Sequence, residues 1–341
     1  MRTLIIKNTI ILLLFATGTL VAQDFHLSNY DAAGKYLNPA LTGMNYPSKT
    51  DYRIDANYRS QWKSVIPKPY TTISLGGDFS HDRFGLGGFI ISNRSGAGNL
   101  NTLNALLSGA YSITADPSGK QNLSVGIQVG IIQRNFNPSE LTFDSQYDDT
   151  KGIFDPGIYN GENFSKTNLV RFDAGLGISY VKMDSTEQFN PFGGFSIFHV
   201  TRPNESFSSE KYLLPMRFVL HGGINIKIND LFYVVPNLLL MYQAKAREIN
   251  PGTLIYYNLR APYFLIGGIN YRNKDAFIIH LGLKHKSNIY RISYDINSSS
   301  LNAYSNGRGA IEFSIVFYGK KFEKEKLPDF IDINNAKKSV W

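Results

Sequence analysis

Apolar and polar residues alternate along most of the chain after residue 50. Between residues 52 and 58, Ile54 and Ala56 lie on one side of an extended backbone, and Asp55 and Asn57 lie on the other. Successive side chains of a β-strand point to opposite faces, so this pattern predicts a strand with one apolar and one polar surrounding.

The same alternation recurs in segments of roughly ten residues, which is the strand length of a membrane-spanning barrel. It predicts fourteen strands, near residues 51–59, 70–79, 83–93, 100–113, 120–134, 169–182, 192–199, 216–228, 232–244, 248–259, 261–272, 276–285, 288–296 and 309–318.

Two architectures are compatible with these strands, a transmembrane barrel and a soluble β-sandwich or pair of sandwiches. Aromatic residues end many apolar faces, as Tyr58, Trp62 and Tyr70 do around one hairpin and Phe317 and Tyr318 do after the last strand. Such residues form the aromatic girdles of membrane barrels. We therefore expect an all-β fold, a transmembrane antiparallel β-barrel of about 14 strands with short periplasmic turns and longer external loops.

The lengths of the connections agree with that topology, because barrel turns are short on the periplasmic side. The expected short turns are 80–82, 229–231 and 286–287, the expected long loops are 135–168, 200–215 and 297–308, and the turn 273–275 is a short exception on the long-loop side.

The N-terminus has the order of a secretory signal peptide, in which Arg2 and Lys7 precede an apolar run that ends in small residues at Ala22. A single membrane-anchoring helix is the alternative. The expected organisation is a signal peptide at 1–22, an N-terminal periplasmic segment at 23–50, the outer-membrane barrel at 51–318 and a periplasmic C-terminal tail at 319–341.

Composition narrows the possible chemistry. The chain has no cysteine, which excludes disulfides and thiol chemistry, and its net charge of +8 comes without a recognisable nucleic-acid-binding module. We expect the positive charge in loops, in the lumen and beside anionic lipid headgroups. The six histidines are scattered and show no metal-ligand spacing. No Gly-x-Ser-x-Gly motif is present, although outer-membrane phospholipases can work without it. We predict no enzyme activity, no metal and no cofactor.

Several short strings resemble the PorP/SprF family of outer-membrane proteins from Bacteroidetes, in the same order along the mature chain. They are Tyr36–Ala40 (YLNPA), Tyr58–Trp62 (YRSQW), Gly85–Gly88 (GLGG), Leu123–Gln128 (LSVGIQ), and Ser293–Asp295 (SYD) with Ser300–Leu301. That family usually has Gly-x-His-Glu before its last strand, whereas Gly309–Glu312 (GAIE) keeps the glycine and the glutamate but lacks the histidine.

The resemblance implies a component of the type IX secretion system in the outer membrane. Its partners would be secreted cargo or the cargo's C-terminal domain, and periplasmic ring or translocon components. In gliding species such proteins hold adhesins at the cell surface. As partner-binding residues we select Tyr58, Arg59, Gln61 and Trp62, at the junction of a strand and an external loop; the alternative is that they form only a girdle and a turn.

Two other functions remain open from the sequence. The polar face of the strands suits a channel for a small solute, and an exported soluble binding module is the third possibility. The strand count does not decide whether the lumen is open or plugged.

Overall fold

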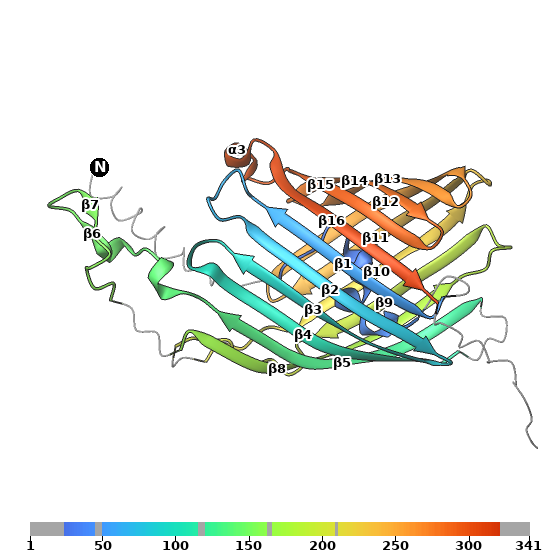
Figure 1. The fold of residues 1–341 in the computed structure, drawn as a ribbon, viewed down its shortest axis with the longest axis horizontal. Coiled ribbons are helices and arrows are strands. Elements are labelled where there is room, and N and C mark those ends of the chain that lie inside the picture. The colour runs from blue at the N-terminus through green and yellow to red at the C-terminus, as the bar shows by residue number, and fades with distance from the viewer. Residues whose placement is uncertain (1–23, 45–49, 115–119, 162–165, 209–210, 321–341) are drawn as a thin grey trace, which may run out of the picture.

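The computed structural model describes residues 24–44, 50–114, 120–161, 166–208 and 211–320. They form a closed antiparallel barrel of fourteen strands (Figure 1). The expected signal peptide and almost all of the expected C-terminal tail lie outside the described residues.

The barrel strands follow the chain order around the wall. They are β1 (Tyr52–Gln61), β2 (Tyr70–His81), β3 (Phe84–Ser95), β4 (Leu100–Ser112), β5 (Gln121–Asn135), β8 (Asn168–Lys182), β9 (Phe189–Phe198), β10 (Arg217–Lys227), β11 (Phe232–Gln243), β12 (Ala246–Arg260), β13 (Tyr263–Arg272), β14 (Ala276–His285), β15 (Asn288–Asn297) and β16 (Arg308–Gly319). The barrel closes where β16 pairs with β1, with Gly319 opposite Tyr52 and Ala310 opposite Gln61. This closure leaves the barrel sheet without a free edge.

Several short elements are not part of the barrel sheet. The strands β6 (Tyr147–Asp148) and β7 (Ile153–Phe154) form a hairpin, and the helical turns are η1 (Tyr30–Ala32), α2 (Gly34–Leu37), η2 (Pro39–Leu41), η3 (Ala97–Asn99), η4 (Pro138–Glu140), η5 (Asp144–Gln146) and α3 (Asn302–Ser305). No helix within the described ranges has the length and hydropathy needed to cross a membrane.

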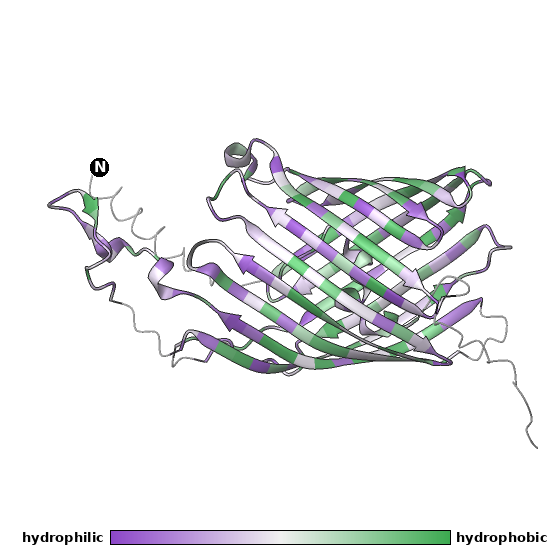
Figure 2. Ribbon diagram, viewed as in Figure 1, coloured by the Kyte–Doolittle hydropathy of each residue, from purple (hydrophilic) through white to green (hydrophobic). Residues whose placement is uncertain are grey.

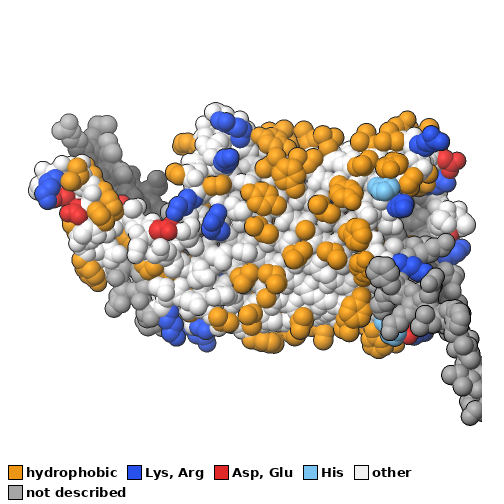
Figure 3. Space-filling model, in the orientation of Figure 1, with side chains coloured by type: hydrophobic (Ala, Val, Ile, Leu, Met, Phe, Trp, Pro, Cys, Tyr) orange, Lys and Arg blue, Asp and Glu red, His pale blue; other side chains and the backbone are white. Residues whose placement is uncertain are grey.

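The structure confirms the predicted fold and the meaning of the alternation. On β1, Ile54 is 46% exposed on the outer face, whereas Asp55 is 2% exposed and faces the lumen. Figure 2 shows this alternation of hydrophobic and hydrophilic residues along the strands, and Figure 3 shows apolar side chains spread over the outer wall. The largest error in a predicted strand bound is at β9, which begins at Phe189 rather than at residue 192.

The two ends of the barrel differ in their connections, as expected. At the short-turn end the strands are joined by turns such as 82–83, 261–262 and 286–287, and at the long-loop end by loops such as 136–167 and 199–216. The turns 244–245 and 273–275 are short connections at the long-loop end. The assignment of the short-turn end to the periplasm stays a prediction.

Candidate functional site

The lumen of the barrel contains the chain's own N-terminal segment, residues 24–44, which we call the lumen plug. It is built from η1, α2 and η2 and is seen inside the barrel in Figure 1. Residues 23–50 were expected as a periplasmic segment. Residues 24–44 lie instead in the lumen, enclosed by the barrel wall. The domain boundaries stay a prediction. The strand count did not decide whether the lumen is open or plugged, and the structure shows that a folded segment occupies it.

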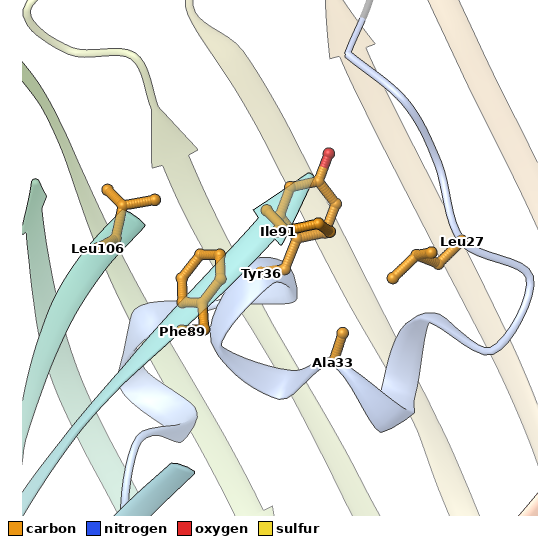
Figure 4. Close-up of a cluster of buried hydrophobic side chains, with 6 residues drawn as sticks. All are labelled: Leu27, Ala33, Tyr36, Phe89, Ile91 and Leu106. Atoms are coloured by element: carbon orange, nitrogen blue, oxygen red, sulfur yellow. The ribbon is translucent and has the colours of Figure 1, made fainter. Parts of the chain in front are cut away.

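Apolar contacts hold one face of the plug against the wall. Leu27, Ala33 and Tyr36 pack on Phe89 of β3 and on its neighbours (Figure 4). A second cluster joins Leu37 to apolar side chains of β9, β10 and β11. The lumen therefore has a small hydrophobic core of its own inside a mostly polar wall.

The first polar anchor is the carboxylate of Glu312 on β16. It accepts hydrogen bonds from the backbone N–H of Ser28 at 2.7 Å and of Asn29 at 2.9 Å, one on each oxygen. Arg59 of β1 donates to Ser28 Oγ at 2.7 Å and pairs with Glu312 at 3.2 Å and Asp295 at 2.9 Å. Wall and plug thus share one buried ion network, in which loss of a single partner leaves a buried charge uncompensated.

The second anchor is Lys35 of α2, which is 1% exposed. Its ammonium group lies 2.5 Å from Asp55 and 2.9 Å from Asp78, and Arg53 also pairs with Asp78 at 2.7 Å. Two cations therefore face two carboxylates, which is the balance that burial in a medium of low dielectric requires.

The third anchor is the Asn38–Ala40 turn, which rests on the walls of β5, β8 and β9. Asn38 Nδ2 donates to the Ile178 carbonyl at 2.9 Å, while Asn38 Oδ1 accepts from the Ala40 N–H at 2.9 Å. Glycine is required beneath the turn, since a Cβ on Gly177 would lie 2.0 Å from Asn38 Oδ1 and one on Gly126 2.4 Å from Ala40 N. These glycines make room for the plug.

The fourth anchor holds the start of the plug at the long-loop end. His199, just after β9, is 3% exposed and lies with Nε2 2.6 Å from Asp24 and Nδ1 2.9 Å from Asp173. Burial opposes the charged imidazole, but the two carboxylates outweigh it and raise the pKa of His199 to about 9. The imidazolium is therefore part of the anchor near neutral pH.

Among the described residues, a cavity lies on each side of the plug. One cavity of about 260 Å³ lies at the long-loop end, between Asp24, Trp62, Arg247 and Asp275. Another of about 270 Å³ lies towards the short-turn end. Beside Leu27, between the plug and β10 and β11, a void of only about 10 Å³ remains, which is scarcely enough for one water.

The structure does not bring the four predicted partner-binding residues onto one surface. Tyr58 is 43% exposed on the outer wall, whereas Arg59 is buried in the lumen as part of the first anchor. Gln61 ends β1, and Trp62 lies at the long-loop end with its ring 4.9 Å from that of Tyr70. Their role in partner binding stays a prediction.

A different surface at the long-loop end presents apolar side chains to solvent. The loop 136–167 carries the β6–β7 hairpin away from the barrel (Figures 1 and 3). On it, Tyr147, Ile153 and Phe154 are about half exposed, and Tyr159 is 74% exposed. We call residues 144–161 the distal hairpin. Sequence reasoning identified this stretch only as part of the expected long loop 135–168.

Sequence reasoning also missed the plug, although its signals were present. Charged residues such as Asp55 and Arg59 lie on the polar faces of strands. Such residues are compatible with a water-filled lumen as well as with a plugged one, so they did not identify the plug. Among the described residues, no group of three or more His, Cys, Asp and Glu could hold a metal ion.

Comparisons with known proteins concern nearly the whole chain. A family model described as "Type IX secretion system membrane protein PorP/SprF" matches residues 20–317. No curated protein matches the chain in sequence.

Solved outer-membrane barrels share the fold at low identity. The toluene transporter TbuX of Ralstonia pickettii is 12% identical with a TM-score of 0.52, and the match covers 85% of this chain and 93% of TbuX. The CymD monoaromatic hydrocarbon channel is 14% identical with a TM-score of 0.52, covering 86% and 93% of the two chains. A deletion mutant of the TodX monoaromatic hydrocarbon channel is 10% identical with a TM-score of 0.51, and the match covers 85% of this chain and 94% of that chain. At these identities the likeness shows the architecture alone.

Proposed function

Because the chain belongs to the PorP/SprF family of type IX secretion system membrane proteins, we propose that it helps to secrete or anchor cargo at the cell surface through protein–protein recognition. The protein is an outer-membrane β-barrel. The cargo would include adhesins, and it would be recognised through its C-terminal domain.

The observation that carries the proposal is the occupied lumen. The plug lies in the lumen between the two cavities and is tied to the wall by buried ion pairs. A polypeptide could pass through the barrel only if the plug moved. A secretion role then rests on the surfaces at the two ends of the barrel.

The distal hairpin is the surface we assign to the cargo. Its apolar side chains are exposed, and its two short strands offer backbone groups to which a β-rich domain can add a strand. Gln61 and Trp62 lie at the same end of the barrel and are proposed as a secondary contact. The short-turn end would face the periplasmic ring or translocon components.

The test uses a strain that lacks the gene and carries tagged variants. We expect loss of the gene to abolish surface display of an adhesin, and the wild-type protein to restore it and to bring down the cargo's C-terminal domain from detergent extracts. The double variant Ile153→Ser/Phe154→Ser should fail to capture cargo.

The matched control is Tyr304→Ser, which removes a side chain that is 75% exposed on α3 at the same end. Heat-modifiable gel mobility must show that every variant is a folded barrel. Unchanged display in the deletion strain, or equal cargo capture by both variants, would count against the proposal.

A channel for a small solute is the second candidate, favoured by the two cavities on either side of the plug. Passage would require the plug to move. Conductance or solute uptake by the purified wild-type protein in bilayers would support it, and a silent bilayer would exclude a constitutively open pore.

A further inference from the structure

The cavity towards the short-turn end has the features of a binding site. It lies between the plug and the lumen face of β9 to β15, with a volume of about 270 Å³. Asn225 is exposed on this wall, so the cavity opens towards the short-turn end. A cavity of this volume is on the scale of a site for a single small molecule.

The charges around the cavity are already compensated. Arg53 pairs with Asp78 at 2.7 Å, and Arg291 of β15 pairs closely with Asp31 of the plug. An ionic ligand would have to compete with these partners. The cavity therefore favours an uncharged ligand.

Neutral polar groups with unused hydrogen-bonding capacity face the same space. His280 is 2% exposed, and its Nδ1 contacts Asn29 at 3.0 Å, but its Nε2 has no hydrogen-bond partner among the described residues. This nitrogen is itself buried, so a ligand in the cavity does not contact it directly.

The tautomer of His221 follows from the plug turn. Asn38 Oδ1 accepts from the Ala40 N–H, so the amide group of Asn38 faces His221 Nε2 at 3.2 Å with its NH₂. An NH₂ group can only donate, so Nε2 must accept and the ring proton must sit on Nδ1. This Nδ1–H is a further neutral donor on the cavity wall, as is the hydroxyl of Tyr256 on β12.

The rest of the lining is apolar and partly aromatic. Leu37 and Leu41 of the plug face Phe192, Val235 and Leu254 of the wall. Asn237 and Asn270 add an amide ladder, in which Asn237 Oδ1 accepts from Tyr30 at 2.8 Å and from Asn270 at 3.1 Å. Apolar patches thus alternate with neutral donors and acceptors around one small space.

We propose that this cavity binds an uncharged, hydroxyl-rich molecule of the size of one sugar ring. A pyranose presents C–H faces to Phe192 and the leucines, and hydroxyls to His221 and Tyr256. A hydrocarbon of the same size would leave the imidazole and phenol groups unpaired, and a sugar acid would meet the compensated arginines.

The test is titration calorimetry of the full chain in detergent with neutral hexoses and N-acetylhexosamines, and with toluene and a sialic acid as competitors of other chemistry. We expect saturable binding of at least one neutral sugar. Methyl glycosides distinguish a free sugar from the end of a glycan, since only the latter tolerates a substituted anomeric oxygen.

The matched variants are Tyr256→Phe and Tyr257→Phe, which remove one hydroxyl from adjacent residues of β12. The first side chain lines the cavity and the second is 37% exposed on the outer wall. Tyr256→Phe should weaken binding about fivefold to tenfold, as expected for one hydrogen bond, and Tyr257→Phe should leave it unchanged.

Asn225→Trp offers a second variant, because it adds bulk at the exposed mouth of the cavity and should abolish binding without disturbing the folded wall. No binding of any neutral sugar at millimolar concentration, preferential binding of toluene or the sialic acid, or equal affinities of the two tyrosine variants would overturn the proposal. These results are independent of cargo capture, so they leave the secretion role untouched.

Discussion

The lumen plug and the distal hairpin are both segments outside the barrel sheet, yet their surroundings are opposite. Most of the plug is buried, and its charged residues pair with wall residues of opposite charge, as Lys35 does with Asp55 and Asp31 with Arg291. The distal hairpin makes its polar contacts mostly within itself, as where Asp148 Oδ1 accepts from the Thr150 N–H at 3.0 Å.

The difference shows how each segment can serve function. The position of a buried charged segment depends on its ion-pair partners, so a change in the segment or in the wall beneath it lowers the unfolding free energy. An exposed loop carries little of the folding free energy, so it can be altered at little cost to the barrel and is suited to recognising a partner. Four predictions, from the largest expected change in stability to the smallest, test this comparison.

The largest effect is expected for Glu312→Leu. The substitution removes the acceptor for two plug N–H groups and leaves Arg59 with one carboxylate fewer, so unfolding free energy should fall by about 3–5 kcal/mol. Urea unfolding in detergent, followed by gel mobility, measures it. Phe313→Leu, on the outer face of the same strand, is the control, and equal midpoints for the two variants would contradict the anchor.

The second prediction concerns pH. His199 has a folded pKa of about 9, above the ordinary value of 6.5, so its contribution is fully present below pH 6.5 and is lost as pH rises through 9. The loss should be on the order of 3 kcal/mol at most. The urea midpoint of unfolding, measured from pH 6 to pH 10, should fall with rising pH in the wild type and should change less with pH in His199→Gln. Parallel pH profiles would refute the assignment.

A smaller effect is expected for Gly177→Ala. The added Cβ would lie 2.0 Å from Asn38 Oδ1, so the plug turn must shift, at a cost of about 1–3 kcal/mol. The control is Gly267→Ala, where a Cβ on β13 meets no atom within 4 Å. Thermal unfolding compares the two, and a similar loss in both would mean that the wall glycines do not serve the plug.

The smallest effect on stability is expected in the distal hairpin. Phe154→Ser should change the unfolding free energy by less than about 0.5 kcal/mol, because its side chain is 42% exposed and lies far from the barrel wall. Cargo capture should nevertheless fall. A large stability loss in this variant would show that the hairpin packs as part of the barrel rather than as a recognition surface.

Sequence reasoning located all fourteen barrel strands and their closure, but it did not find what the lumen-facing side chains contact. Arg59 was placed in a partner-binding patch because it follows Tyr58 near a loop, whereas it faces the lumen and binds Ser28. The period of two gives the face of a residue but not what lies opposite that face. Residues 24–44 have no such period, so their position could not be read from the pattern.

The sequence by itself determined the class of the protein, because alternating strands, aromatic strand ends and unequal loops are local properties of the chain. Only the tertiary structure decided what fills the lumen. Contacts such as those of Ser28 with Glu312 span 284 residues, and they form only when the closed wall brings the polar faces of distant strands together around the plug. Buried charges need partners in space, and those partners need not be near in sequence.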